Sequence, residues 1–109
     1  MLRWINEWHA HGYLVRLVFT ALDSPELALE RVATRVLLGG HDVPEEVVRR
    51  RWATGLRTFF DIYVTVVDEW ILFDNSGQNL RRVAEGTRED PAPRIIDQQR
   101  WALLRSLAA

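Results

Sequence analysis

Apolar residues recur every three or four positions in several stretches of the chain, and this spacing is typical of amphipathic helices. The first such stretch is residues 2–11, where Trp4, Ile5 and Trp8 share one side of the predicted helix. Gly12 follows, and glycine often ends helices because it adopts left-handed backbone conformations without steric cost. We therefore expect a short N-terminal helix that stops at Gly12.

Two longer helices are predicted further along the chain. The first starts at residues 23–26 (DSPE), which combine a capping side chain, an early proline and an acid near the positive helix end, and it stops at Gly39-Gly40. The second starts at residues 44–46 (PEE) and stays amphipathic as far as Val66. Its end is open, because residues 62–67 (IYVTVV) have the composition of a strand.

Residues 13–21 (YLVRLVFTA) are almost wholly apolar and rich in β-branched and aromatic types. Such a run predicts a strand buried on both faces, as in a parallel sheet covered by helices. Arg16 is its one charged residue, so we expect Arg16 near a sheet edge or a strand end.

The remaining elements are shorter. Residues 70–73 (WILF) predict a buried strand that is closed by the turn signal DNSG, and residues 80–85 predict another strand at the sheet border. Residues 87–93 (TREDPAP) predict a loop, and Asp97 predicts the start of a last helix. The order α-β-α-α-β-β-α is that of a layered α/β domain.

Length and composition limit the classes of function. The 109 residues form one domain at most, and the net charge of −1 predicts no attraction to nucleic acid or to anionic membranes. The chain has no cysteine, which excludes disulfides, a thiolate nucleophile and cysteine metal sites. No apolar run approaches the ~20 residues of a membrane span, and the N-terminal stretch is not a signal peptide. We therefore expect a cytoplasmic protein.

The candidate binding residues are arginines, and they lie on the two long helices that flank one turn. Arg31 and Arg35 are four residues apart and so share a helix face, while residues 49–51 (RRR) lie early in the next helix. Guanidinium groups bind phosphate oxygens in bidentate fashion, so converging arginines would form a phosphate site. The alternative is a plain helical hairpin whose arginines are solvated.

The motif E-R-V-x-x-R, followed by G-G-H-x-V-P, R-R-W and D-N-S, resembles the C-terminal half of the zeta-toxin-like P-loop kinases, small bacterial proteins often labelled predicted ATPases of the zeta toxin family. The resemblance runs from about Gly12 to the end of the chain. It implies a partial P-loop kinase-type fold over residues 1–109, with a short, mostly parallel sheet, flanking helices and a helical lid.

The resemblance also implies roles for individual residues. Arg31, Arg35 and Arg51 would contact phosphate, Gly39-Gly40-His41 would form the lid turn, and the loop at Asp74-Asn75 would lie near the adenine. It assigns no catalytic residue and no metal ligand to this chain. The complete family enzymes use ATP and Mg²⁺, their founding members phosphorylate a UDP-linked amino sugar, and an antitoxin is a further expected partner.

The chain also departs from the family pattern. It contains no G-x-x-x-x-G-K-[ST] loop and no lysine, and Thr54 and Thr58 stand where a basic residue and an asparagine are expected. The P-loop half would precede Met1. Two functions remain open: the nucleotide-closing half of a small-molecule kinase, inactive alone, or a non-enzymatic remnant that acts as a binding or assembly module.

Two further expectations concern carboxylates and association. Asp68, Glu69 and Asp74 are interpreted as cap and turn residues, because their spacing straddles two elements instead of forming a metal cluster. Without a neighbouring strand, residues 13–21 would form an apolar sheet edge, which is a liability for association. We expect self-association through this edge or through the tryptophan-bearing first helix.

Overall fold

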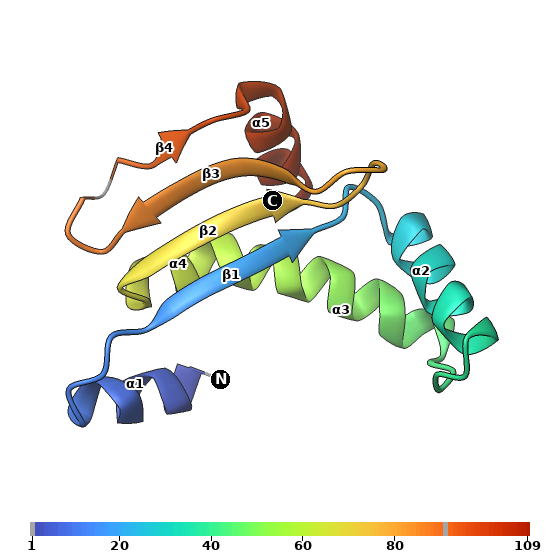
Figure 1. Cartoon of the computed structure of the whole chain (residues 1–109), viewed down its shortest axis with the longest axis horizontal. Helices are drawn as coiled ribbons and strands as arrows, with labels where there is room; N and C mark the ends of the chain where they lie inside the picture. Colours follow the sequence, from blue (N-terminus) through green and yellow to red (C-terminus); the bar gives the residue numbers. More distant parts are fainter. Residues whose placement is uncertain (1, 91) are drawn as a thin grey trace.

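The computed structural model describes residues 2–90 and 92–109 and shows a sheet of four strands with helices packed against it (Figure 1). The elements are α1 (Leu2–Ala10), β1 (Arg16–Ala21), α2 (Pro25–Leu37), α3 (Glu45–Thr58), the π-helical turn η1 (Phe59–Tyr63), α4 (Val64–Val66), β2 (Glu69–Asp74), β3 (Arg81–Thr87), β4 (Arg94–Ile95) and α5 (Gln98–Leu107). The prediction of an α/β domain is confirmed.

The strands lie in the order β1-β2-β3-β4. β1 and β2 are parallel, whereas β2 with β3 and β3 with β4 are antiparallel. The prediction of a mostly parallel sheet is therefore wrong. Parallel neighbours require a long crossover, and the segment that contains α2 and α3 provides one between β1 and β2. After Asp74, a short turn brings the chain back alongside β2, and strands joined by a short turn pair antiparallel.

β1 is buried on one face only. Leu17, Phe19 and Ala21 point towards the helices, whereas Val18 on the other face is 56% exposed. The prediction of a strand buried on both faces is wrong, because the helices that contribute to the core lie on one side of the sheet. Arg16 is the first residue of this edge strand, as predicted, and its Nη2 lies 2.7 Å from Oε2 of Glu69.

The strand-like run at residues 62–67 is mostly helical. α3 continues through η1 and α4 to Val66, and only then does the chain turn towards β2. The wider η1 turn accompanies two consecutive buried aromatic residues, Phe59 and Phe60, which a regular α-helix would point about 100° apart. Packing of these two rings against the sheet overrides the local strand composition.

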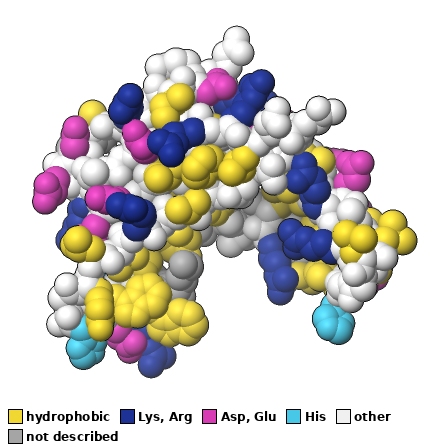
Figure 2. Space-filling model, in the orientation of Figure 1, with side chains coloured by type: hydrophobic (Ala, Val, Ile, Leu, Met, Phe, Trp, Pro, Cys, Tyr) yellow, Lys and Arg dark blue, Asp and Glu magenta, His cyan; other side chains and the backbone are white. Residues whose placement is uncertain are grey.

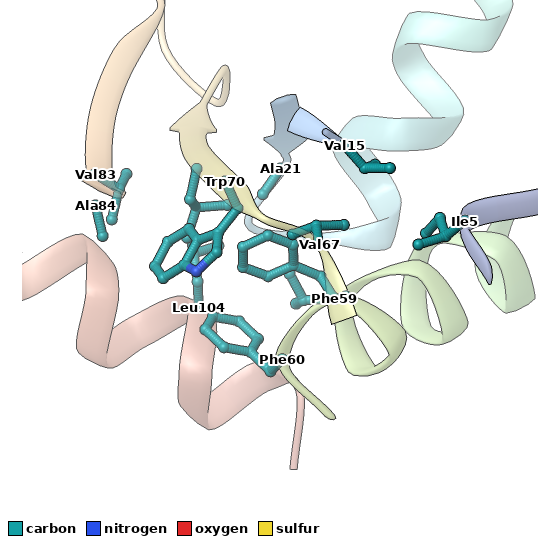
Figure 3. Packing of buried hydrophobic residues seen from close by; sticks show 12 residues of the cluster. Ile5, Val15, Ala21, Phe59, Phe60, Val67, Trp70, Val83, Ala84 and Leu104 are labelled. Carbon is teal, nitrogen blue, oxygen red and sulfur yellow. The ribbon is translucent and has the colours of Figure 1, made fainter. Parts of the chain in front are cut away.

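The core joins the sheet to α3, η1 and α5. Figure 3 shows Trp70 beside Phe59, with Phe60 and Leu104 below it. The rings of Phe59 and Trp70 meet edge to face, with centroids 5.5 Å apart. Phe59 also stacks on Phe19 of β1 at 4.8 Å, so one fully buried ring joins two strands to the helical layer.

The predicted starts and stops of the helices are confirmed. Ser24 Oγ accepts a hydrogen bond from Leu27 N at 3.1 Å, and Asp97 Oδ1 accepts one from Arg100 N at 3.1 Å. Gly12 follows the C-terminal end of α1, with φ +83°. β4 is not predicted from the sequence, because its two residues are too few to show a period.

Candidate anion-binding site

A pocket of about 380 Å³ opens at the carboxyl end of β1, between α2 and α3. Its position follows from the sequence, since the chain leaves β1 and starts α2 within four residues, with Pro25 pre-set for the first turn. The lining residues are Phe19, Thr20, Ala21, Leu22, Ala28, Arg31, Val32, Arg35, Val43, Val48, Arg51, Trp52, Gly55 and Leu56.

Three arginines line this pocket, and its lining includes no aspartate or glutamate. Arg31 and Arg35 come from one face of α2, and Arg51 comes from α3. Within residues 2–90 and 92–109, the side chains of Arg35 and Arg51 are exposed and make no ion pair. Figure 2 shows arginine side chains gathered where α2 borders a hollow in the molecular outline. The pocket is therefore cationic, and no carboxylate in its lining balances this charge.

Arg31 differs from the other two arginines. Its Nη2 donates a hydrogen bond to the carbonyl oxygen of Asn75 at 2.8 Å, which ties α2 to the turn after β2. One part of the guanidinium is thus already engaged, although the fork offers five donors in total. Arg31 can hold the pocket wall in place and still donate to a ligand.

The floor of the pocket is apolar and aromatic. Trp52 is half-buried there, and its indole Nε1 donates to the carbonyl oxygen of Leu22 at 2.8 Å. Leu56, beside it, is buried. An arginine rim over an apolar floor can receive an anionic group and the less polar part of the same ligand.

The turn between α2 and α3 takes its shape from two glycines. Gly39 has φ +97°, a conformation that L-residues with side chains rarely adopt. Gly40 N donates to Arg35 O at 2.8 Å, and a Cβ at Gly40 would lie 2.9 Å from that oxygen. His41 is exposed and does not line the pocket.

Asp74, predicted to be part of an adenine-side loop, is 2% exposed and lies at the end of β2. Its carboxylate accepts hydrogen bonds from Arg100 Nε and from Ser76, and Arg100 Nη2 also donates to Asp23 Oδ2 at 2.9 Å. Burial acts to raise the pKa of Asp74, but the hydrogen bonds from Arg100 and Ser76 outweigh it and hold that pKa below its ordinary value. Asn75 contributes its backbone carbonyl to Arg31.

This network borders a second, polar pocket of about 440 Å³ that includes Asp23, Asp74 and Arg100. Sequence reasoning missed Arg100, because 77 positions separate it from Asp23 and 26 from Asp74, and no local pattern joins them. The place of Trp52 in the pocket floor was also missed, because the sequence does not distinguish it from the other apolar positions of this amphipathic helix.

The other carboxylates near β2 go to separate partners. Asp68 Oδ2 accepts from Val15 N at 2.6 Å and lies 2.8 Å from His9 Nε2. The backbone hydrogen bond and then the contact with His9 lower the pKa of Asp68. In the described part of the chain, no three His, Asp or Glu side chains gather as a metal site would require.

Comparisons with protein-family models, curated proteins and solved structures found no match to this chain. Among the described residues, no helix combines the length and the apolar character needed to cross a membrane.

Proposed function

We propose that the pocket between α2 and α3 binds the phosphates of a nucleotide, and that the chain is the nucleotide-closing lid half of a zeta-toxin-like kinase for small molecules. The observation that carries the proposal is the convergence of Arg31, Arg35 and Arg51 on one pocket without an acidic neighbour in its lining. In this proposal ATP arrives with Mg²⁺ and is held on its other side by a P-loop polypeptide.

Charge and geometry support a phosphate ligand. Two arginines on one helix face and a third from the facing helix can donate to different oxygens of one polyphosphate, and arginine–phosphate pairs are often bidentate. A carboxylate in the lining would have paired with these arginines and lowered the gain on binding an anion. The carboxyl end of a strand is also where α/β sheets commonly bind ligands.

The test is an NMR titration of the chain with ATP and, separately, with pyrophosphate. Binding should be weak and salt-sensitive, because Arg35 and Arg51 are exposed and their charges are screened. Amide resonances of residues 39–51 should shift first, together with the indole signal of Trp52. Arg35→Gln or Arg51→Gln should weaken binding roughly five- to tenfold, since each removes charge-assisted hydrogen bonds.

Arg50→Gln is the matched control, because Arg50 neighbours Arg51 on α3, is exposed and does not line the pocket. It should leave binding nearly unchanged. Equal losses for the Arg50 and Arg51 variants would show only a general charge effect, and shifts confined to α1 would refute the site.

The second candidate is a non-enzymatic binding or assembly module. It is favoured by the absence of lysine and of a Walker-type loop in the sequence. It is also favoured by the state of Asp74, the buried carboxylate at the end of β2, which Arg100 already engages. The DNA upstream of the Met1 codon distinguishes the two. An encoded Gly-x-x-x-x-Gly-Lys-Ser/Thr supports the kinase half, and its absence supports the module.

A further inference from the structure

Two tryptophans of α1 point into solvent. Trp4 is 59% and Trp8 is 40% exposed, and the segment after the helix adds Tyr13 at 65% and Leu14 at 86%. Figure 2 shows hydrophobic side chains gathered over the lobe at lower left, where Figure 1 places α1. We name these four side chains the α1 face.

The α1 face is not the side by which the helix packs on its own chain. Ile5 fills that role, with none of its surface exposed, and His9 Nε2 lies 2.8 Å from Asp68 Oδ2 on the sheet side. Because residues advance by 100° along a helix, Trp4 and Trp8 form a separate stripe about a quarter turn from Ile5 and His9. Ile5 and His9 therefore hold α1 against its own chain, and the stripe of Trp4 and Trp8 remains exposed.

The exposed area is large enough for a stable contact. The four side chains leave on the order of 600 Å² of mostly apolar surface uncovered, whereas a standard interface buries about 800 Å² per partner. Flanking polar groups would supply the remainder. Contiguous apolar patches of this size on a monomer generally mark an interaction surface.

Charge indicates which partner fits. Arg3 and Glu7 flank the tryptophan stripe on the side away from Ile5, and Arg3 Nε lies 4.0 Å from Glu7 Oε1. A second α1 running antiparallel would place its Glu7 near Arg3 of the first copy, and its Arg3 near Glu7. The α1 face is therefore complementary to itself, as a two-fold interface requires.

We infer that two copies of the chain associate about a two-fold axis through their α1 faces, with the two α1 helices antiparallel. The alternative surface is the free edge of β1, which is recessed. α1 and α2 lie at opposite ends of β1 in Figure 1, and the outline in Figure 2 is hollowed between them. The radius of gyration of 15.0 Å, against roughly 13 Å for a compact chain of this length, reflects these protruding parts. An approaching second copy would contact α1 and α2 before its own β1 could pair with this edge.

The experiment is light scattering on a size-exclusion column at several protein concentrations. The chain should approach twice its own mass as concentration rises. Trp4→Gln with Trp8→Gln should weaken the dimer about 30-fold or more, because buried tryptophans dominate interface energies. Leu38→Gln is the matched control: Leu38 is 83% exposed at the C-cap of α2, so its loss should leave the dimer unchanged.

A charge exchange tests the antiparallel arrangement without removing apolar area. Arg3→Glu alone and Glu7→Arg alone should each weaken the dimer by roughly two- to fivefold, and the double exchange should restore it. Circular dichroism should show unchanged helix content in each variant.

Three outcomes would overturn the inference. The first is a monomer at every concentration. The second is a dimer that survives the tryptophan changes but is lost with Val18→Gln on β1. The third is a loss of dimer in the Arg3→Glu and Glu7→Arg variants that the double exchange does not reverse. A monomer whose tryptophan fluorescence responds to phosphatidylcholine vesicles would assign the α1 face to a lipid surface instead.

Discussion

At the scale of single residues, Gly86 shows how one missing methyl group sets the packing of the sheet. Gly86 of β3 pairs with Trp70 of β2, and a Cβ at Gly86 would lie 2.6 Å from the indole ring. Trp70 cannot move away easily, because its ring is edge-on to Phe59 and stacks on Trp101 with centroids 6.0 Å apart. The glycine is therefore required by a side chain on the neighbouring strand.

We expect Gly86→Ala to lower the free energy of unfolding by about 1–3 kcal/mol, the usual cost of overpacking a filled core. Chemical denaturation followed by tryptophan fluorescence measures this loss. Gly77→Ala is the control, since a Cβ there would meet nothing within 4 Å, and it should be nearly neutral. A neutral Gly86→Ala would mean that the indole has room to shift.

At the scale of elements, one guanidinium joins three parts of the chain. Arg100 at the start of α5 contacts Asp74 at the end of β2 and Asp23 in the segment between β1 and α2. Its side chain is 22% exposed and that of Asp74 is 2% exposed, so this ion pair is largely shielded from water. By contrast, both side chains of the Arg16–Glu69 pair are about half exposed or more.

We expect Arg100→Met to lower the free energy of unfolding at neutral pH by about 3 kcal/mol, because it leaves the Asp74 carboxylate buried without its main partner. The folded-state pKa of Asp74 is lowered, so its stabilising contribution is present above the ordinary aspartate pKa and is lost as pH falls through the folded-state value. The difference between wild type and variant should therefore narrow in acid.

Denaturation curves at a series of pH values provide the measurement. Arg16→Met is the control, since exposed ion pairs contribute at most about 1 kcal/mol. Equal losses for the Arg16 and Arg100 variants, or a difference that does not change with pH, would contradict the role assigned to Arg100.

At the scale of the whole molecule, the pocket of Arg31, Arg35 and Arg51 and the polar pocket beside Asp74 both lie at the carboxyl ends of the parallel pair β1 and β2. The phosphate binding proposed for the first of these pockets is a different step from phosphoryl transfer. Phosphoryl transfer depends on Mg²⁺, a lysine and cradling amide groups, and this chain contains no lysine.

We therefore expect the purified chain, with ATP and Mg²⁺, to release no phosphate above the uncatalysed rate. A coupled phosphate assay measures it, with Arg35→Gln as the control for a contaminating ATPase, whose activity would not change. Turnover that is abolished by Arg35→Gln would show that this chain carries out the chemistry by itself.

The sequence by itself determined the helices, most of the strands and the α/β class. Caps and stops such as Ser24, Gly12 and Asp97 act through hydrogen bonds to residues a few positions away, so the local sequence is enough to predict them. The spacing of Arg31 and Arg35 likewise places them on one helix face without help from any tertiary contact.

Tertiary structure decided the rest, because it depends on residues that are distant in the sequence. The helical state of residues 62–66 follows from packing of Phe59 and Phe60 on the sheet, against the local strand composition. The mixed sheet follows from where each connection returns the chain. Arg51 reaches the pocket of Arg31 only because α3 folds back on α2, and Arg100 finds Asp23 across 77 positions. Contacts of this kind leave no periodic pattern in the sequence, because the residues come together only when the chain packs.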